Sequence, residues 1–517
     1  MANKSLFQTI AGKLLPRTDA LNHELGRAYA YTPKHALAQY AATGCLSHTF
    51  YAGADDQLAK VLELAGQVEP EFVAKTALWC REKGYMKDMP AVLVAALSVL
   101  EPDLMAKAFP RVIDSGKMLR NFVQVLRSGQ VARKSLGTRP KRLVRQWLDA
   151  RGDEQLFKDS VGNSPSLADV VKMVHPKPLT ASRRAFYGWL LGKAHDASAL
   201  PQLVRDFAAF KAGQTKDVPD VPFQMLTALE LGRAEWTAIA RKAPWQMTRM
   251  NLNTFARHGV YDERGLVGQI ANRLRDPEAI KRARAFPYQL LAAYKAAGSE
   301  VPGAVRDALH DAMEIAIGNV PQIDGKVYVC PDVSGSMRSP VTGFRAGATT
   351  AVRCVDVAAL MAAAVLRRNR DAEVLPFEHD VVDVKLSGRD SVLTNAEKLA
   401  SVGGGGTNCS APLSRLNWKG ARGDLVIFVS DNESWVDARG GRGTATMQEW
   451  NTFKKRNPKA RLVCIDIQPY GTTQAAERED VLNVGGFSDQ VFEIVATFAQ
   501  GRLDADHWVG VIEKTQL

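Results

Sequence analysis

The spacing of hydrophobic residues follows two different patterns along this chain, and the change falls near residue 320. Up to about residue 318, apolar residues recur at i, i+3, i+4 and i+7, which predicts a succession of α-helices. We predict helices at residues 71–83, 90–100, 117–127, 141–150, 183–193, 244–257 and 287–297. Since we find no strand-like segment between them, we expect an irregular α-solenoid of HEAT-like helix pairs rather than one compact bundle.

After Gly325 the pattern becomes short, wholly apolar and rich in β-branched residues. We predict strands at residues 326–331, 373–377, 424–430 and 461–467, separated by helical stretches that include residues 355–368 and 444–457. Strands that alternate with helices indicate a parallel sheet covered on both faces. We therefore expect two domains, a helical-repeat domain at residues 1–320 and a doubly wound α/β domain at residues 321–517.

Composition excludes several classes of protein. The 517 residues are 46% apolar and 24% charged, which is ordinary globular usage and unlike disordered or collagenous chains. No apolar run reaches the ~20 residues needed to span a bilayer, and the first residues lack the apolar core of a signal peptide. The six cysteines have no zinc-ligand spacing. We therefore expect a cytoplasmic protein with reduced, buried thiols and no membrane partner.

Positive charge is concentrated in the helical part. The formal net charge is +12, and residues 1–320 carry +13 while residues 321–517 carry −1. One stretch is basic without any intervening acid: Arg133, Lys134, Arg139, Lys141, Arg142 and Arg145. A solvated helix face would explain such a run. However, a turn here leads into a predicted helix, so the helix N-terminal amides add to the side-chain cations and favour an anion-binding surface.

Hydroxyl and carboxylate side chains follow the predicted strands of the second domain. Asp332, Ser334 and Ser336 follow the first strand, Asp431 follows the strand at 424–430, and Thr407 ends a run of four glycines. Ligands of open parallel sheets bind at the carboxyl ends of strands. Hard oxygen donors suit Mg²⁺, Mn²⁺ or Ca²⁺, and we expect one divalent cation here, Mg²⁺ first. The alternative is that these residues only end strands and cap helices.

This set resembles the metal-ion-dependent adhesion site of von Willebrand factor A domains, at all five positions. The resemblance implies that Ser334, Ser336 and Thr407 bind the metal through their hydroxyls. It also implies that Asp332 and Asp431 bind directly or through water, and that one coordination position is left for an acidic ligand. Phosphotransfer is the alternative chemistry. It is disfavoured because no Asp lies two residues after Asp332 and no Gly-x-x-x-x-Gly-Lys-[Ser/Thr] motif occurs.

The two halves together resemble the Ro autoantigen family, in which a helical TROVE domain is joined to a von Willebrand A domain, and its bacterial members. The resemblance rests on several motifs in order: Arg127-Ser-Gly, the basic helix of residues 137–147, residues 166–178, residues 244–260, residues 281–292, and the three metal-site segments. His175 falls where the family has a histidine important for Y RNA binding. Lys134, Arg139, Lys141, Arg142 and Lys172 are expected contacts on the same surface.

The resemblance implies a monomeric, non-catalytic ring of helices closed by the A domain. Family members bind small noncoding Y RNAs on a basic outer face and pass single-stranded 3′ ends of misfolded RNA through the central hole, for RNA quality control or decay. A further implied partner is a 3′ to 5′ exoribonuclease such as polynucleotide phosphorylase.

Two alternative functions stay open from the residues alone. One is a metal-dependent protein-binding scaffold with incidental RNA affinity, and the other is a Mg²⁺-dependent phosphohydrolase. The excess of positive charge in residues 1–320 favours RNA binding over the protein-binding scaffold. The RGG-like loop at residues 439–443 is interpreted as a connector rather than an RNA-binding element.

Overall fold

The computed structural model describes residues 15–517 except 44–45, 47–48, 50, 284, 286, 342, 345–351, 437–442, 487–488 and 504–505; the side chains of residues 319 and 489 are also outside the description. Cys45 and most of the RGG-like loop therefore lie outside the described residues. The chain divides into two compact units. Unit 1 comprises Met1–Gln67, Arg275–Ala296 and Ala308–Lys514, and unit 2 comprises Val68–Leu274, Ala297–Asp307 and Thr515–Leu517.

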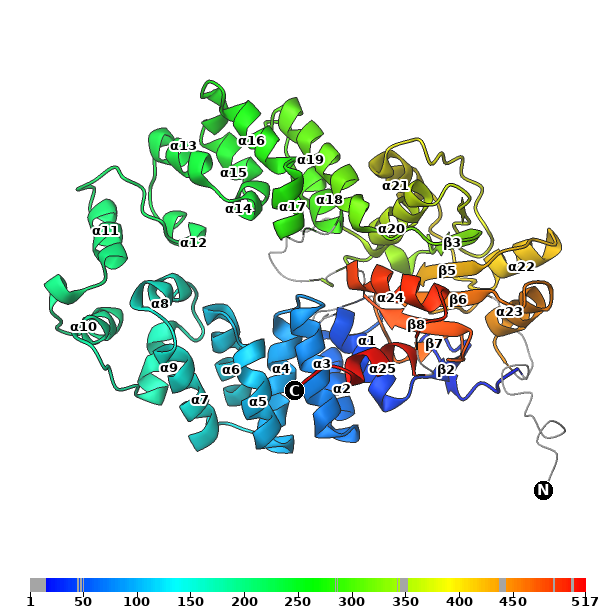
Figure 1. Cartoon of the computed structure of the whole chain (residues 1–517), viewed down its shortest axis with the longest axis horizontal. Helices are drawn as coiled ribbons and strands as arrows, with labels where there is room; N and C mark the ends of the chain where they lie inside the picture. Colours follow the sequence, from blue (N-terminus) through cyan, green and yellow to red (C-terminus); the bar gives the residue numbers. More distant parts are fainter. Residues whose placement is uncertain are drawn as a thin grey trace. The chain divides into compact units, whose positions relative to one another are not determined.

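Unit 2 is an array of helices in which near neighbours along the chain pack together (Figure 1). Its helices are α3 (Pro70–Glu82), α4 (Asp88–Leu100), α5 (Pro102–Val112), α6 (Gly116–Ser128), α7 (Thr138–Asp149), α8 (Asp153–Asp159), α9 (Leu167–Val174), α10 (Ala181–Leu190), α11 (Gln202–Lys211), α12 (Phe223–Leu226), α13 (Arg233–Lys242), α14 (Trp245–Met250), α15 (Leu252–Arg257) and α16 (Leu266–Leu274). Short 3₁₀ turns lie at Ala197–Ala199 and Val260–Asp262.

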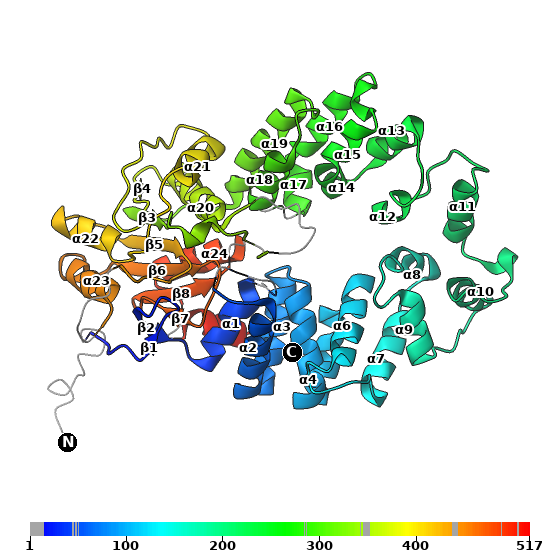
Figure 2. The same ribbon diagram turned by 180° about the vertical axis from the view of Figure 1, so that it is seen from behind.

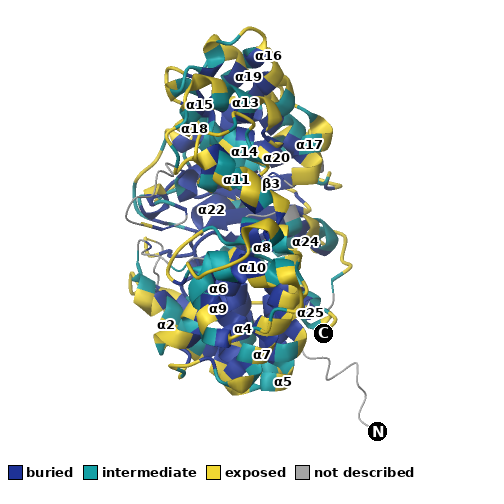
Figure 3. Cartoon of the chain, turned by 90° about the vertical axis from the view of Figure 1, so that its left-hand side faces the viewer, coloured by how far each residue is buried: buried dark blue, intermediate teal, exposed yellow. Residues whose placement is uncertain are grey.

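The helices predicted from hydrophobic spacing are present, with one division. The segment predicted as one helix at residues 244–257 forms α14 and α15, because the chain leaves helical geometry at Asn251. The backbone amide of Asn251 donates to the Thr248 carbonyl at 3.2 Å, and its side-chain amide donates to the Met247 carbonyl at 2.8 Å. Each helix buries the apolar face that predicted it; Leu119, Phe122 and Leu126 of α6, for example, are fully buried. This burial can be followed in Figure 3 and confirms the helical solenoid class.

Unit 1 contains a five-stranded parallel sheet in the order β4-β3-β5-β6-β8 (Figure 2). The strands are β3 (Val327–Pro331), β4 (Glu373–Val374), β5 (Leu425–Ser430), β6 (Arg461–Asp466) and β8 (Val481–Gly485). The helices that follow α19 (Gly303–Ala316) are α20 (Cys354–Arg368), α21 (Val392–Ala400), α22 (Ala411–Trp418), α23 (Ala445–Arg456), α24 (Asp489–Ala499) and α25 (His507–Glu513), with 3₁₀ turns at Ile317–Asn319 and Ser336–Arg338.

Both faces of the sheet are covered, as predicted for a doubly wound domain. On one face, Cys330, Phe428 and Cys464 pack in a buried core with Trp450 and Phe453 of α23. On the other face α20 packs against β3 and β5, and α24 packs against β8. The strands are apolar throughout because neither face meets water. Among the described residues, no helix has the length and apolar character needed to cross a membrane.

The prediction that the first 318 residues hold no strand is wrong for residues 20–30. β1 (Ala20–Leu21) pairs with β2 (Arg27–Ala30), and β2 pairs antiparallel with β7 (Thr472–Thr473) in a second, three-stranded sheet. These strands are too short to show a period of two residues. They are stabilised by a segment more than 440 residues away, and Tyr29 enters the α/β core.

Three further helical segments of the predicted first domain also lie in unit 1. They are α1 (Pro33–Thr43) with α2 (Ala54–Gln67), α17 (Pro277–Ala283) with α18 (Pro287–Ala296), and most of α19. α1 packs on β8 and α25, and α18 packs on α20. The predicted domain boundary at residue 320 marks where helices give way to alternating strands and helices. The compact units divide differently, because these helices pack against the α/β fold.

Candidate metal centre and candidate RNA interface

The five predicted metal residues lie at the carboxyl edge of the sheet in unit 1. β3 and β5 pair in parallel with Pro331 opposite Val429, so the residues after each strand emerge side by side. All five are almost fully buried: Asp332 0% exposed, Ser334 0%, Ser336 6%, Thr407 2% and Asp431 4%. Polar side chains at this depth require partners within the protein or a bound ion.

Hydrogen bonds connect four of these side chains. The Asp332 carboxylate accepts from the Ser334 amide at 2.8 Å and from the Ser430 hydroxyl at 2.6 Å. The hydroxyls of Ser334 and Ser336 lie 3.4 Å apart, and Ser336 is hydrogen bonded to Asp431. Two carboxylates and two hydroxyls from different strand ends are thus gathered into one polar cluster.

The glycine loop that precedes Thr407 packs onto the turn after β3. The Gly404 amide donates to the Val333 carbonyl, and the Gly335 amide donates to the Gly405 carbonyl, both at 2.9 Å. Gly403 has a φ of +79°, and a Cβ there would lie 2.3 Å from the Val333 carbonyl oxygen, so only glycine fits. This packing explains the glycines of the motif and brings the loop that ends in Thr407 against the turn that carries Ser334 and Ser336.

The electrostatics of the cluster favour a bound cation. Burial raises the pKa of Asp332. Burial, with the neighbouring Asp332 charge, raises the pKa of Asp431 to about 8. Within the described part of the chain, no three His, Cys, Asp or Glu side chains form a metal-binding group, so hydroxyls must complete any coordination. Carboxylate and hydroxyl oxygens suit a hard divalent ion, and the residues present therefore fit the cation that the sequence predicts.

The predicted RNA contacts lie in unit 2 around α7 and α9, which pack together. The Arg145 guanidinium of α7 donates to the Val174 carbonyl at the end of α9. His175 ends α9 in the left-handed conformation, with φ +50°, and its side chain is exposed. Lys172 is exposed on the preceding turn. The two motifs that the sequence placed 30 residues apart therefore form one surface.

The predicted cations fall into two groups. Arg133 donates to the Ser98 carbonyl at 2.9 Å, and Arg139 pairs with Asp103 at 2.6 Å, so both guanidinium groups already have partners within the protein. Arg145, which donates to the Val174 carbonyl, belongs with these two. The remaining four predicted cations are Lys134, Lys141, Arg142 and Lys172. The side chains of these four make no hydrogen bond or ion pair with the described residues. Lys134, Arg142 and Lys172 are exposed and Lys141 is half-buried.

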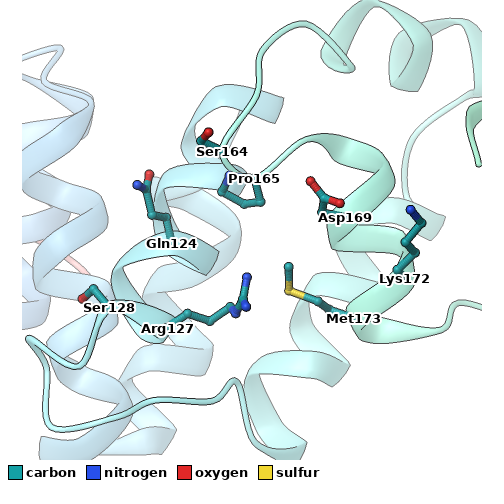
Figure 4. Close-up of a pocket in the computed structure, with 8 residues that line it drawn as sticks. All are labelled: Gln124, Arg127, Ser128, Ser164, Pro165, Asp169, Lys172 and Met173. Atoms are coloured by element: carbon teal, nitrogen blue, oxygen red, sulfur yellow. The ribbon is translucent and has the colours of Figure 1, made fainter.

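An open cavity of about 650 Å³ adjoins this surface between α6 and α9 (Figure 4). It is lined by Gln124, Arg127, Ser128, Ser164, Pro165, Asp169, Lys172 and Met173. In Figure 4, Arg127 extends from α6 toward the opening, across from Asp169 on α9. The pKa of Asp169 is lowered, first by hydrogen bonds from Ser166 and also by the Lys172 and Arg127 charges.

Arg127 was missing from the predicted contacts. Its exposed side chain at the end of α6 has no hydrogen-bond or ion-pair partner among the described residues. The sequence signal was its place in the Arg127-Ser-Gly motif, where Gly129 ends α6 with a φ of +91°.

Comparison with known proteins finds similar sequences and a similar structure. Residues 326–499 match the family described as the Ro60 vWA domain. The RNA-binding protein RO60 of Deinococcus radiodurans is 24% identical over 97% of this chain and 100% of its own length. The RNA-binding protein RO60 of Caenorhabditis elegans is 23% identical over 52% of this chain and 43% of its own length.

A solved structure agrees in fold. The crystal structure of the Deinococcus radiodurans RO (RSR) protein superposes with a TM-score of 0.64 at 22% identity, covering 91% of this chain and 100% of that one. Residues 326–499 thus match the von Willebrand factor A domain of Ro60, and the chain is similar to a Ro60 protein over 97% of its length.

Proposed function

We propose that this protein binds RNA without cleaving it, through the basic face formed by α7, α9 and the loop before α7. The observation that carries the proposal is the exposed group of Lys134, Arg142 and Lys172, whose side chains have no hydrogen-bond or ion-pair partner among the described residues, together with exposed His175. Cations without internal partners are available to phosphates. The relatives named RNA-binding protein RO60 support the same conclusion.

The RNA we propose is a small structured noncoding RNA of the Y type. A duplex stem is recognised mainly by shape and by phosphate contacts, which suits point charges on two adjacent helices. Single-stranded 3′ ends of misfolded RNA would bind separately, in the central hole of a monomeric ring, as the Ro resemblance implies. The cellular role would be RNA quality control or decay in the cytoplasm, with a 3′ to 5′ exoribonuclease such as polynucleotide phosphorylase as partner.

We also propose that Asp332, Ser334, Ser336, Thr407 and Asp431 hold one Mg²⁺ ion. When bound, the ion would neutralise the two buried carboxylates and provide a Lewis-acidic position for an oxygen ligand. The chain's own residues hold the surrounding loops: Ser430 fixes one Asp332 oxygen, and the glycine loop fixes Thr407.

Filter binding with a Y-type stem RNA across a salt series tests the proposed RNA function. We expect the triple variant Lys134→Ala, Lys141→Ala, Arg142→Ala to bind at least about tenfold more weakly. We also expect it to show a log–log salt slope smaller by about 3, since each phosphate contact contributes about 0.9.

The matched control removes three exposed lysines elsewhere in unit 2: Lys211, Lys216 and Lys242. The change in net charge is the same, so a general electrostatic effect would weaken both variants equally. The proposal fails if the two triple variants bind alike, or if wild-type affinity is micromolar or weaker at physiological salt.

A further inference from the structure

A short turn of the N-terminal segment, residues 22–26, lies against the residues that follow Asp431. The Asn22 side-chain amide donates to the Ser434 carbonyl at 2.6 Å. The His23 backbone amide donates to the Glu433 carboxylate at 2.8 Å, and the His23 ring lies 3.4 Å from the other carboxylate oxygen. Glu433 is fully buried. These contacts join positions 410 or more residues apart within unit 1.

The turn is shaped for this contact. Asn22 accepts from the Gly26 amide through its side chain at 2.7 Å, and its backbone amide donates to the Gly26 carbonyl at 2.9 Å. A Cβ on Gly26 would lie 2.4 Å from the Ser434 carbonyl oxygen, a distance that no side chain tolerates. Asn22 therefore both closes the turn and holds it to the A domain, and Gly26 allows the close approach.

Aromatic rings extend this contact to one of the proposed metal ligands. The His23 ring stacks on Tyr51 at 5.5 Å and meets the edge of Tyr470 at 5.2 Å, while the two tyrosine rings lie 5.2 Å apart. The Tyr51 side chain is hydrogen bonded to Ser336, one of the five proposed ligands. At least one proposed ligand is thus contacted by a residue of the N-terminal segment, although sites at the ends of parallel strands are ordinarily open to a partner.

We propose that residues 22–26 and Tyr51 form a cover that closes the metal site from within the same chain. A cation can still be held by the five ligands, but an acidic group of a partner reaches it only after the cover is displaced. The proposal rests on the proposed metal site, and it changes the expectation of a freely open coordination position. Metal-dependent docking in trans would then be conditional on release of the N-terminal turn.

Gly26→Ala tests the cover without altering any ligand, because its Cβ meets the Ser434 carbonyl. The matched control is Gly66→Ala, at a glycine with no atom within 4 Å of the added carbon. Hydrogen–deuterium exchange of the full-length, metal-free protein should show at least about tenfold faster exchange of the peptide at residues 430–436 in Gly26→Ala only. Unchanged exchange in that variant would overturn the proposal.

A second measurement uses Mn²⁺ as the metal and acetate as the acidic probe. We expect wild-type protein to bind Mn²⁺ while leaving acetate proton relaxation at the level of a metal-free control. Gly26→Ala should bind Mn²⁺ with similar affinity and relax acetate several-fold faster. Equal, fast acetate relaxation in both proteins would mean that the site is open and the cover proposal is wrong.

The two experiments separate failure of the cover from failure of the metal site. If neither protein binds Mn²⁺, the proposed metal site fails, and the exchange result decides alone whether the turn covers this edge. If Gly26→Ala does not fold, Asn22→Ala replaces it, since it removes the side-chain hydrogen bonds to Ser434 and Gly26. The same exchange and relaxation outcomes then apply.

Discussion

The Lys295 ammonium of α18 lies 2.6 Å from the Asp356 carboxylate of α20. Asp356 is buried and also accepts from the backbone and guanidinium of Arg353. Burial alone would raise the pKa of Asp356, but the hydrogen bonds from Arg353 and Lys295 outweigh it and leave the pKa below its ordinary value. A helix predicted in the first domain is thereby joined to the α/β fold.

Lys295→Met should therefore destabilise the protein by about 1–3 kcal/mol, as expected for loss of one hydrogen bond to a buried charge. Because the folded pKa of Asp356 is lowered, its contribution is present above the ordinary pKa and is lost as pH falls through the folded pKa. Urea unfolding at pH 7 measures the change. Lys60→Met, which breaks an exposed pair with Glu63, should cost less than about 1 kcal/mol; equal losses would contradict the assignment.

The pH dependence of stability should contain a contribution from His35. Its ring is buried and bonded to the Asn483 carbonyl at 3.0 Å, and burial lowers its pKa to about 4. The folded protein therefore resists protonation that the unfolded chain accepts. Stability should fall as pH drops from about 6.5 to about 4, by about 1.4 kcal/mol per unit from this group. His35→Gln should lack that part of the slope; parallel unfolding curves for the two proteins would refute the claim.

Metal binding should be visible as thermal stabilisation. At a Mg²⁺ concentration 100 times the Kd, a single site that binds only the folded state adds about 2.7 kcal/mol. We expect Asp332→Ala to lose this stabilisation, whereas Asp383→Ala, at an exposed carboxylate of the same unit, should retain it. A Mg²⁺ effect that persists in Asp332→Ala would show that the ion binds elsewhere.

The arginines of α7 should contribute unequally to RNA affinity. Arg139 is paired with Asp103, whereas Arg142 has no partner among the described residues. Arg142→Ala should therefore weaken RNA binding more than Arg139→Ala. Asp103→Ala should strengthen it a few-fold by releasing Arg139 to the phosphates. Filter binding at low salt compares all three, and the reverse order for the two arginines would contradict the assignment.

The protein should not hydrolyse phosphate esters. Asp332 is fully buried and hydrogen bonded on both oxygens, which leaves it poorly placed as a nucleophile. With Mg²⁺ and p-nitrophenyl phosphate we expect no nitrophenol release above a protein-free blank. Release that disappears in Asp332→Ala would support the phosphohydrolase alternative.

The spacing of apolar residues predicted many of the helices and strands, which depend mainly on residues close together in the sequence. Helix spacing located α3, α4 and α6, and buried strands located β3, β5 and β6, since each element shows its own period of apolar residues. Four of the five proposed metal ligands follow β3 or β5 and could be grouped because parallel strands end at one edge of the sheet, whereas Thr407 ends the glycine run and its role as a ligand was implied by the resemblance. β8 was not predicted, although its burial is complete.

The amino-acid sequence by itself determined the helical and α/β character of the two halves, the donor set at the sheet edge and the excess of positive charge. Only the tertiary structure decided which of those charges are paired, as with Arg139 and Asp103, and which distant segment contacts the residues after Asp431. The reason is physical: His23 and Glu433 are in contact although 410 residues separate them in the chain. The spacing of apolar residues within a segment predicts its own secondary structure but not which distant segment it contacts.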